Sequence, residues 1–599
     1  MQWGEFGEFF RAVRPVLKNA VRSGRIFRPQ CTLTEPDPDI LCEFDVEIPL
    51  ADGTFVTANV FRSRRAQEAG EKCPVVMCAH PYDNHLIPAL GKTPLGGPPL
   101  QYRMIPQEGK PEFSTLTSWE SPDPNFWVRS GYAVVNMNLP GFANSGGRPG
   151  LSSPDQVDAF GQAIDWIGGR EWCSGSVGLS GVSFLAISQY GVAAGQGAHG
   201  VPKCLKAISP WEGVRDFYRE MFYEGGIPEL GFPVFWWHTE VKPTINCSEA
   251  EFIEIEGQLP QDMGSAHPFY DEYWQSKVPP VADLELPMLI CASFSDQGLH
   301  TRGSFGIFRE ARSDQKWLYT HRRLKWDAYY SREVQEATKA FFDHFLKGEE
   351  ANGFLDQAPV RLEVRASRDE IREVRGEEEW PLARTRYEKW FLAEGDLLQA
   401  EASDDAGEAV YDVRSGDLRY RRTFERDTEW TGYMKLRLWV EVRALSSTAL
   451  SATATATATA PDDMALFIGV DKLDAQGERV CFYGSVGNHA DLMTRGLIAA
   501  SRRALDLEAS TEFEPTLAHQ CDEKLAPGEI VPLEIALNPS STFFRAGEGI
   551  ELIISPREIV PSPPYRKSTE HNRGLHVIHF GGQYDSYLLA PDIPPQPSD

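Results

Sequence analysis

A short run of small and β-branched residues at positions 177–186 ends in a turn that carries a serine, Ser183. The run predicts a strand that turns sharply into a helix and leaves the serine hydroxyl exposed at the crest of a parallel sheet. Gly181 supplies the residue without a Cβ that such a tight turn needs. Leu185 stands where the usual G-x-S-x-G pattern has its last glycine, so Ser180 remains an alternative nucleophile. The segment therefore constrains the chain to an α/β fold with a serine at a strand end.

The length of 599 residues exceeds what one hydrophobic core normally organises, so we expect two or three domains. A content of 42% hydrophobic and 24% charged residues is typical of a folded globular protein. The formal net charge of −27 disfavours binding to nucleic acids and to anionic membranes, because both would repel the protein. No apolar run of about 18 residues occurs, so no membrane-spanning helix is expected.

The 10 cysteines form no C-x-x-C pair, and several lie in apolar runs, so we expect buried, reduced thiols. The first residues lack the charged start and apolar core of a secretory signal, which predicts a cytoplasmic protein. Residues 6–28 carry a loose apolar stripe opposite basic residues. This stripe predicts a helix that docks on the protein, with a transit peptide as the alternative.

The order of predicted elements divides the chain near residue 355. Residues 36–210 and 277–354 alternate strand-like and helical runs, which predicts a mostly parallel, doubly wound sheet covered by helices. Residues 1–35 are expected to form an N-terminal helical extension, and the aromatic segment 211–276 a helical cap. Residues 355–599 contain short strand-like runs parted by turns, which predicts a β-sandwich. The Ala/Thr alternation at 451–460 predicts an exposed loop, with an edge strand as the alternative.

A serine hydroxyl needs a base to take its proton and an acid to orient that base. Asp296 suits the acid, because it closes an apolar strand-like run ahead of a glycine turn. His321 suits the base, because it ends the next strand-like run, and neighbouring parallel strands end at the same sheet edge. His300 is set aside because it lies too close to Asp296 in the sequence.

An oxyanion that forms at Ser183 needs hydrogen-bond donors. The backbone N–H of Phe184 is one candidate, and the hydroxyl of Tyr82, in the turn after an early strand, is the other. Aromatic residues of the predicted cap are candidate substrate contacts: Trp211, Phe217, Phe222, Phe235 and Trp236. No residues show metal-ligand spacing, so we expect neither a metal nor another cofactor.

The chain resembles the cocaine esterase and X-Pro dipeptidyl-peptidase group of serine hydrolases. The segments that carry the resemblance are Pro81-Tyr82-Asp83, Gly181-Val182-Ser183-Phe184-Leu185, Ser295-Asp296-Gln297-Gly298, residues 341–348 and Tyr584-Asp585-Ser586-Tyr587-Leu588. The resemblance implies an α/β-hydrolase domain, an inserted helical cap and a C-terminal jelly roll. It also implies Ser183 as nucleophile, Asp296 as acid, His321 as base, and Tyr82 with the Phe184 amide as the oxyanion hole.

These observations predict hydrolysis of carboxylic esters through an acyl-enzyme on Ser183. The expected substrate is a small molecule with a hydrophobic or aromatic acyl group, and the domain set implied by the resemblance can pack as a homodimer. Cleavage of amides, as in an X-Pro dipeptidyl peptidase or an acylase, is an alternative. Acyl transfer or cyclisation by the same triad is another. The non-enzymatic alternative is an inactive hydrolase whose jelly roll serves as a binding module.

Overall fold

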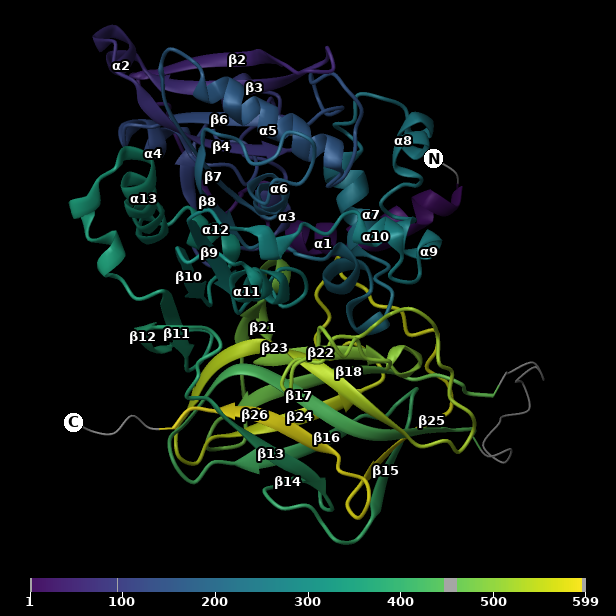
Figure 1. The fold of residues 1–599 in the computed structure, drawn as a ribbon. Helices are drawn as coiled ribbons and strands as arrows, with labels where there is room; N and C mark the ends of the chain where they lie inside the picture. The colour runs from purple at the N-terminus through teal and green to yellow at the C-terminus, as the bar shows by residue number, and fades with distance from the viewer. Residues whose placement is uncertain (1–2, 94, 446–459, 595–599) are drawn as a thin grey trace.

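The computed structural model describes residues 3–93, 95–445 and 460–594. Two bodies lie against each other, an α/β domain and an all-β domain formed by the C-terminal part of the chain (Figure 1). Apart from Ala460, the Ala/Thr alternation at 451–460 lies outside the described residues. Within the described residues, no helix combines the length and the apolar content needed to cross a bilayer.

The central sheet of the α/β domain has the strand order β2-β3-β6-β4-β7-β8-β9-β10-β11. Its strands are β2 (Ile40–Pro49), β3 (Phe55–Ser63), β4 (Cys73–His80), β6 (Ala133–Asn138), β7 (Cys173–Val182), β8 (Leu205–Trp211), β9 (Met288–Ser293), β10 (Lys316–His321) and β11 (Val360–Arg365). The β2–β3 hairpin and the β3–β6 pair are antiparallel, and the pairs from β6 to β11 are parallel. This topology confirms the predicted α/β-hydrolase fold.

Helices cover both faces of the parallel sheet, because its strands are apolar on both sides. The helices that contact its strands are α4 (Pro124–Arg129), α5 (Pro154–Gly168), α6 (Phe184–Ala193), α11 (Thr301–Glu310) and α13 (Arg332–Lys347). The domain also contains the short helices α2 (Arg64–Ala69), α3 (Gln101–Met104) and α12 (Lys325–Tyr329). Two of the helices begin or end at residues typical of helix ends. Ser153 caps the start of α5, and Gly348 ends α13 in the left-handed conformation with φ 74°.

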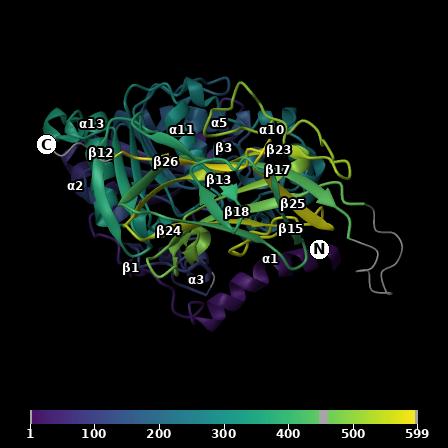
Figure 2. The same cartoon turned by 90° about the horizontal axis from the view of Figure 1, so that it is seen from below.

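A mostly helical segment lies between β8 and β9. It contains η2 (Tyr218–Phe222), η3 (Glu224–Gly226), α7 (Phe232–Trp236), η4 (Trp237–Val241), α8 (Glu249–Glu256), α9 (Met263–Ala266) and α10 (Glu272–Gln275). The N-terminal helix α1 (Trp3–Arg22) packs against α7 and α3 and buries Ala12, Val16 and Ala20. Figure 2 shows α1 along one edge of the molecule. A short strand pair, β1 (Thr32–Thr34) with β5 (Glu112–Ser114), follows it.

The C-terminal domain is a two-layered β structure around its own apolar core. Its strands are β13 (Arg386–Ala393), β14 (Leu397–Gln399), β15 (Gly407–Asp412), β16 (Leu418–Thr423), β17 (Thr428–Arg443), β18 (Ala465–Leu473), β19 (Arg479–Val480), β20 (Phe482–Gly484), β21 (Asn488–Asp491), β22 (Thr494–Ala499), β23 (Val531–Phe544), β24 (Gly549–Ser555), β25 (Leu575–Phe580) and β26 (Tyr587–Asp592). The strand before them, β12 (Ile371–Glu377), pairs antiparallel with β11 and extends the central sheet. The long strands β17 and β23 pair antiparallel, and alternate residues of β17, such as Leu436 and Leu438, are fully buried.

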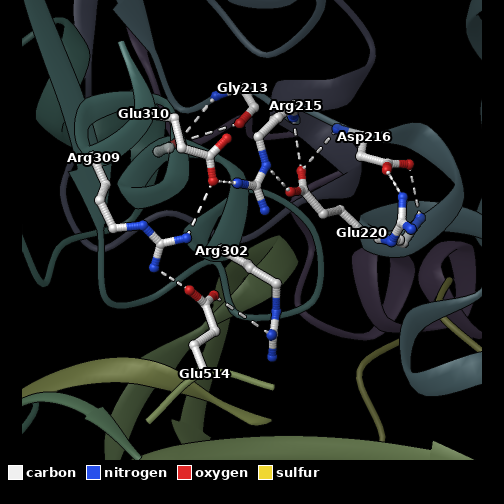
Figure 3. A network of polar contacts seen from close by, with 10 residues as sticks. Gly213, Arg215, Asp216, Glu220, Arg302, Arg309, Glu310 and Glu514 are labelled. Carbon is white, nitrogen blue, oxygen red and sulfur yellow. Dashed lines mark hydrogen bonds and ion pairs between the residues drawn. The ribbon is translucent and has the colours of Figure 1, made fainter. Parts of the chain in front are cut away.

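An ion-pair network joins the two domains at α11 (Figure 3). The Glu514 carboxylate of the C-terminal domain forms an ion pair with the Arg309 guanidinium and lies 3.9 Å from the Arg302 guanidinium. The network continues through Glu310, the last residue of α11, which pairs with Arg309 at 3.1 Å and also with Arg215. The Arg215 guanidinium in turn pairs with Glu220 at 3.2 Å. Gly303 allows the close approach, since a Cβ there would lie 2.4 Å from Glu220 Oε2. The network therefore fixes α11 between the cap segment and the β domain.

Replacing Glu514 by Gln is expected to destabilise the protein by about 2 kcal/mol at pH 7, because two partly buried guanidinium groups lose their carboxylate. Burial opposes ionisation, but Arg309 and Arg302 lower the pKa of Glu514 below its ordinary value of 4.5. The stabilisation is therefore complete above pH 4.5 and is lost as the pH falls through the lower folded-state pKa. Scanning calorimetry at several pH values measures this difference.

The matched control is Glu508→Gln, which changes an exposed carboxylate of the same segment. It is expected to leave the thermal transition within experimental error of the wild type. A Glu514→Gln protein that is as stable as this control at pH 7 would contradict the interpretation of the network.

Candidate active site

Ser183 lies in the turn between β7 and α6, where the sequence predicts a nucleophile elbow. Its backbone has φ 60° and ψ −116°, a conformation that residues with side chains rarely adopt. Gly181 precedes it with φ 151°, and a Cβ at this position would lie 2.5 Å from Leu185 Cβ. The turn therefore needs glycine before the serine, while the fully buried Leu185 fills the position after it. Ser183 itself remains partly exposed.

The strained backbone of Ser183 is held by the neighbouring strand. Its N–H donates to the carbonyl oxygens of Trp211 and Glu212, both at 3.1 Å, and the N–H of Val182 donates to the Glu120 carbonyl at 3.2 Å. Glu212 and Glu120 also have positive φ angles, 52° and 63°. Three residues in unfavourable conformations thus support one another, which is typical of functional sites.

The imidazole at hydrogen-bonding distance from Ser183 belongs to His300. His300 Nε2 lies 3.2 Å from Ser183 Oγ, and His300 Nδ1 lies 2.5 Å from Asp296 Oδ2. His300 caps the start of α11, and both its side chain and that of Asp296 are buried. The three side chains form a continuous serine, histidine and carboxylate chain.

The structure does not bring His321 to Ser183, which corrects the choice of base made from the sequence. His321 ends β10 as predicted, but its Nε2 lies 3.0 Å from Glu212 Oε1, and its buried Nδ1 has no hydrogen-bond partner among the described residues. Its ring stacks on Trp211, with centroids 5.5 Å apart. Ser293 Oγ donates to the other oxygen of Glu212 at 2.9 Å.

Local backbone geometry brings His300 to Asp296 even though the two residues are only four positions apart in the sequence. The carbonyl oxygen of Asp296 accepts the N–H groups of Leu299, His300 and Thr301 at 3.0–3.1 Å. The segment therefore makes one helical turn, in which side chains four positions apart face each other. The signal was the spacing Asp-x-x-x-His, which places acid and base on one face of a turn.

A lysine, which the sequence interpretation did not single out, lies against this pair. Lys325 Nζ is 2.7 Å from Asp296 Oδ2 and 2.9 Å from His300 Nδ1. Burial, followed by Lys325, lowers the pKa of His300 below its ordinary value of 6.5, although Asp296 opposes the shift. Burial alone would raise the pKa of Asp296, but Lys325 and His300 lower it well below its usual range. Asp296 is therefore ionised in the folded protein.

The predicted oxyanion donors lie on two sides of the elbow. Phe184 is the first residue of α6, so its N–H has no acceptor within the helix. The Tyr82 hydroxyl accepts a hydrogen bond from Trp236 Nε1 at 3.3 Å, which leaves its own proton free to donate. The Tyr82 ring meets the Phe184 ring edge to face, with centroids 6.3 Å apart. Burial, followed by Glu240, raises the pKa of Tyr82 well above 10, so its phenol stays protonated.

Two carboxyl groups that the sequence interpretation missed also face the site. Glu120 is buried, and one of its oxygens accepts from Trp326 Nε1 at 3.1 Å. Burial raises its pKa well above 4.5, although Lys325 opposes the shift. Glu240, on η4, is partly exposed, yet burial of its carboxyl raises its pKa to about 7. Neither residue stands in a sequence pattern that marks it.

A cavity of about 510 Å³ lies where α1, the cap and the C-terminal domain meet. Its walls include Val16 of α1, Ile105, Phe235 of α7, and residues 485–490 and 561–564. Two of the lining residues, Phe235 and Ser485, are connected to the candidate site through neighbouring residues. Phe235 precedes the tryptophan that contacts Tyr82, and Ser485 Oγ accepts the Gly298 N–H at 2.7 Å, two residues before His300.

The five aromatic residues predicted to contact substrate occupy different places. Trp236 stacks on Phe184, with centroids 6.0 Å apart, and Phe235 lines the cavity. Trp211 lies under His321, Phe222 packs on Trp274 in the interior of the cap, and Phe217 is buried in the core. Among the five, Trp236 adjoins the elbow through Phe184, and Phe235 lines the cavity.

Two groups of side chains around the site could in principle hold a metal ion. They are Glu212 with Cys291 and His321, and Glu212 with Asp296 and His300. In the second group the Lys325 ammonium already lies beside Asp296 at the distance of an ion pair. This arrangement suits a site that uses protonated side chains as its local cations.

Two family models match the chain. The model described as X-Pro dipeptidyl-peptidase (S15 family) matches residues 52–324, and the model of the X-Pro dipeptidyl-peptidase C-terminal non-catalytic domain matches residues 352–589. The cocaine esterase of a Rhodococcus species is 26% identical over 397 residues, and a putative Xaa-Pro dipeptidyl-peptidase of Bacillus cereus is 23% identical over 360 residues. These alignments cover 58% and 55% of the chain but only 62% and 57% of the two relatives.

Solved structures resemble the whole chain. A CocE/NonD family hydrolase from Staphylococcus aureus has a TM-score of 0.78 at 34% identity, over 92% of this chain and 94% of that one. An α-amino acid ester hydrolase shares the fold, with a TM-score of 0.64 at 13% identity over 92% of this chain and 97% of that one. The family matches, the two-domain architecture and the serine elbow agree, and the chain therefore belongs to the CocE/NonD family of hydrolases.

Proposed function

We propose that the protein hydrolyses carboxylic esters through a covalent acyl-enzyme on Ser183, with His300 as the base and Asp296 as the acid. The observation that carries the proposal is the chain of contacts from Ser183 Oγ to His300 at 3.2 Å and from His300 to Asp296 at 2.5 Å. Membership of a serine hydrolase family supports the same chemistry. The proposal replaces His321, which pairs with Glu212, by His300.

In the first half-reaction, Ser183 Oγ bonds to the ester carbonyl carbon while its proton passes to His300 Nε2. The carbonyl π electrons become an oxyanion, for which the Phe184 N–H and the Tyr82 hydroxyl are the proposed donors. Collapse of this intermediate breaks the ester C–O bond, and His300 returns the proton to the departing alcohol oxygen. Water then repeats the sequence on the acyl-enzyme and releases the acid.

The cavity that Phe235 and Ser485 help to line supports small substrates with apolar groups. Its volume of about 510 Å³ falls within the range of small-molecule sites. Phe235, Ile105 and Val16 contribute apolar wall, and polar groups such as Asn19 and His489 contribute the remainder. We propose that one part of the ester occupies this cavity during the reaction.

Covalent labelling with a fluorophosphonate tests the assignment of nucleophile and base. The wild type is expected to react, Ser183→Ala to remain unlabelled, and hydrolysis of p-nitrophenyl butyrate by Ser183→Ala to fall by about four to six orders of magnitude in kcat. His300→Gln is expected to lower kcat for the same ester by about four orders of magnitude, because no other imidazole contacts the Ser183 oxygen in the described structure.

His321→Gln is the matched control for His300→Gln. It changes a buried imidazole on the adjacent strand, and since neither ring nitrogen contacts Ser183 we expect it to keep at least a tenth of wild-type labelling. The assignment is refuted if His321→Gln abolishes labelling in a folded protein while His300→Gln retains it.

Cleavage of peptides or esters that carry a free α-ammonium group is a second candidate function. The observation that favours it is the pair of carboxyl groups, Glu120 and Glu240, in the electrostatic surroundings of Tyr82. Burial raises the pKa of each carboxyl group, that of Glu240 to about 7, so both bind a proton more readily than an exposed glutamate does. A substrate ammonium would pair with them as they ionise.

Comparing substrates separates the two candidates. If neutral esters are the substrates, we expect p-nitrophenyl butyrate to be hydrolysed with a kcat/KM at least tenfold above that for Gly-Pro p-nitroanilide, and Glu240→Gln to change ester hydrolysis less than threefold. An ammonium substrate would instead lose about tenfold or more in kcat/KM in this variant, since a charged hydrogen bond contributes about 1.5–3 kcal/mol.

Glu254→Gln, an exposed carboxylate of α8 in the same cap, is the control and is expected to affect neither substrate. Rapid anilide turnover that is sensitive to Glu240→Gln, together with inert esters, would overturn the ester proposal in favour of the second candidate.

A further inference from the structure

Lys325 is the first residue of α12 and lies directly against both charged partners of the proposed triad. Its Nζ is 2.7 Å from Asp296 Oδ2 and 2.9 Å from His300 Nδ1, and its side chain is only 10% exposed. A nucleophile, a base and an acid complete the mechanism given above, and that mechanism assigns this ammonium no part.

Charged and titratable groups surround the triad from every element packed on it. Asp296 comes from the turn after β9, Glu212 from the end of β8, Glu120 from the loop before α4 and Glu240 from η4. Lys325 interacts favourably with all four carboxyl groups. Several carboxyl groups in a low-dielectric site would otherwise repel one another and take up protons.

The position of the ammonium limits how the triad can share its protons. Asp296 Oδ2 lies within reach of both Lys325 Nζ and His300 Nδ1, so it can accept two hydrogen bonds, one from each cationic or polar donor. The Asp296 carboxylate remains ionised, and its negative charge stabilises both the Lys325 ammonium and the His300 imidazole. At 2.9 Å, a positive charge on Lys325 also opposes a second positive charge on His300.

We propose that Lys325 is a positioning residue of the triad, which holds Asp296 ionised against His300 and sets the pH range in which His300 accepts and returns the serine proton. The inference rests on the proposed function, because it needs His300 as the base. With the ammonium in place, His300 stays neutral to lower pH. The imidazolium formed during attack also returns its proton to the leaving group more readily, because Lys325 opposes its charge.

Removing the charge tests this role. Lys325→Met and Lys325→Gln are expected to lower kcat for p-nitrophenyl butyrate by about 10- to 100-fold at pH 7, less than the 10²- to 10⁴-fold typical of the proton transfer itself, with KM changed less than threefold. The acid limb of the kcat/KM profile is expected to move to higher pH, because His300 takes up a proton more readily without the neighbouring cation. Rates of fluorophosphonate labelling should show the same displacement.

Lys325→Arg keeps the positive charge and is expected to keep the acid limb at the wild-type position, even where its larger head lowers kcat. Lys325→Gln retains a hydrogen-bond donor for Asp296 and so keeps the test valid if Lys325→Met fails to fold. Lys472→Met is the matched control, because Lys472 is a buried lysine paired with Glu548 at 2.8 Å in the C-terminal domain. We expect it to lower the thermal transition without moving the pH profile.

The inference is overturned if the acid limb of the kcat/KM profile stays at its wild-type position in both Lys325→Met and Lys325→Gln. It is also overturned if Lys325→Arg moves the acid limb as far as Lys325→Met does. Labelling of Ser183→Ala or wild-type activity of His300→Gln would instead overturn the proposed function. A folded Lys325→Met protein with wild-type kcat and pH profile, beside inactive Ser183→Ala and His300→Gln variants, would remove only the role of Lys325.

Discussion

The rest of the proposed site depends on the single helical turn from Asp296 to His300, which brings their side chains into contact. Because the Asp296 carbonyl accepts the N–H groups of the residues that follow it, the carboxylate and the imidazole face each other without help from a second strand. The C-terminal domain fixes this turn from outside. Ser485 accepts the N–H of Gly298, and Asn538 donates to the carbonyl oxygen of Gln297 at 3.2 Å. A domain that supplies no member of the proposed triad thus helps to position His300, the proposed base.

Patterns that reflect local backbone geometry could be predicted from the sequence. Alternating strand and helix signals gave the correct α/β-hydrolase fold, and Gly181 marked the elbow because no other residue fits beside Leu185. Asp296 was chosen as the acid because it follows a buried strand-like run, and its carboxylate contacts His300 rather than His321. The choice of His321 rested on the assumption that acid and base come from neighbouring strand ends. His321 does end the next strand, but its partner is Glu212, whose position depends on a positive φ that no sequence pattern marks.

Buried charges account for most of what could not be predicted. Glu120, Glu212 and Asp296 come from three separate segments and lie together only after the sheet has formed. Each carries a desolvation cost that one ammonium, Lys325, helps to offset. Their sequence neighbours are ordinary, so neither composition nor spacing indicates that they converge. The overall charge of −27 is equally uninformative here, since solvent screens distant surface charges while the groups inside the site are a few ångströms apart.

The cavity proposed to bind part of the substrate also depends on the C-terminal domain. Its walls come from the N-terminal helix, the cap and two loops of the C-terminal domain, and the Asp296–His300 turn is bonded to one of these loops through Ser485. A shift of the β domain would therefore alter the shape of the cavity and the position of His300 together. The ion pairs of Glu514 with Arg302 in the first turn and Arg309 in the last turn of α11 oppose such a shift. Under the proposed function, binding and proton transfer are therefore coupled through α11, which the proposed base His300 caps and whose last turn is fixed to the β domain.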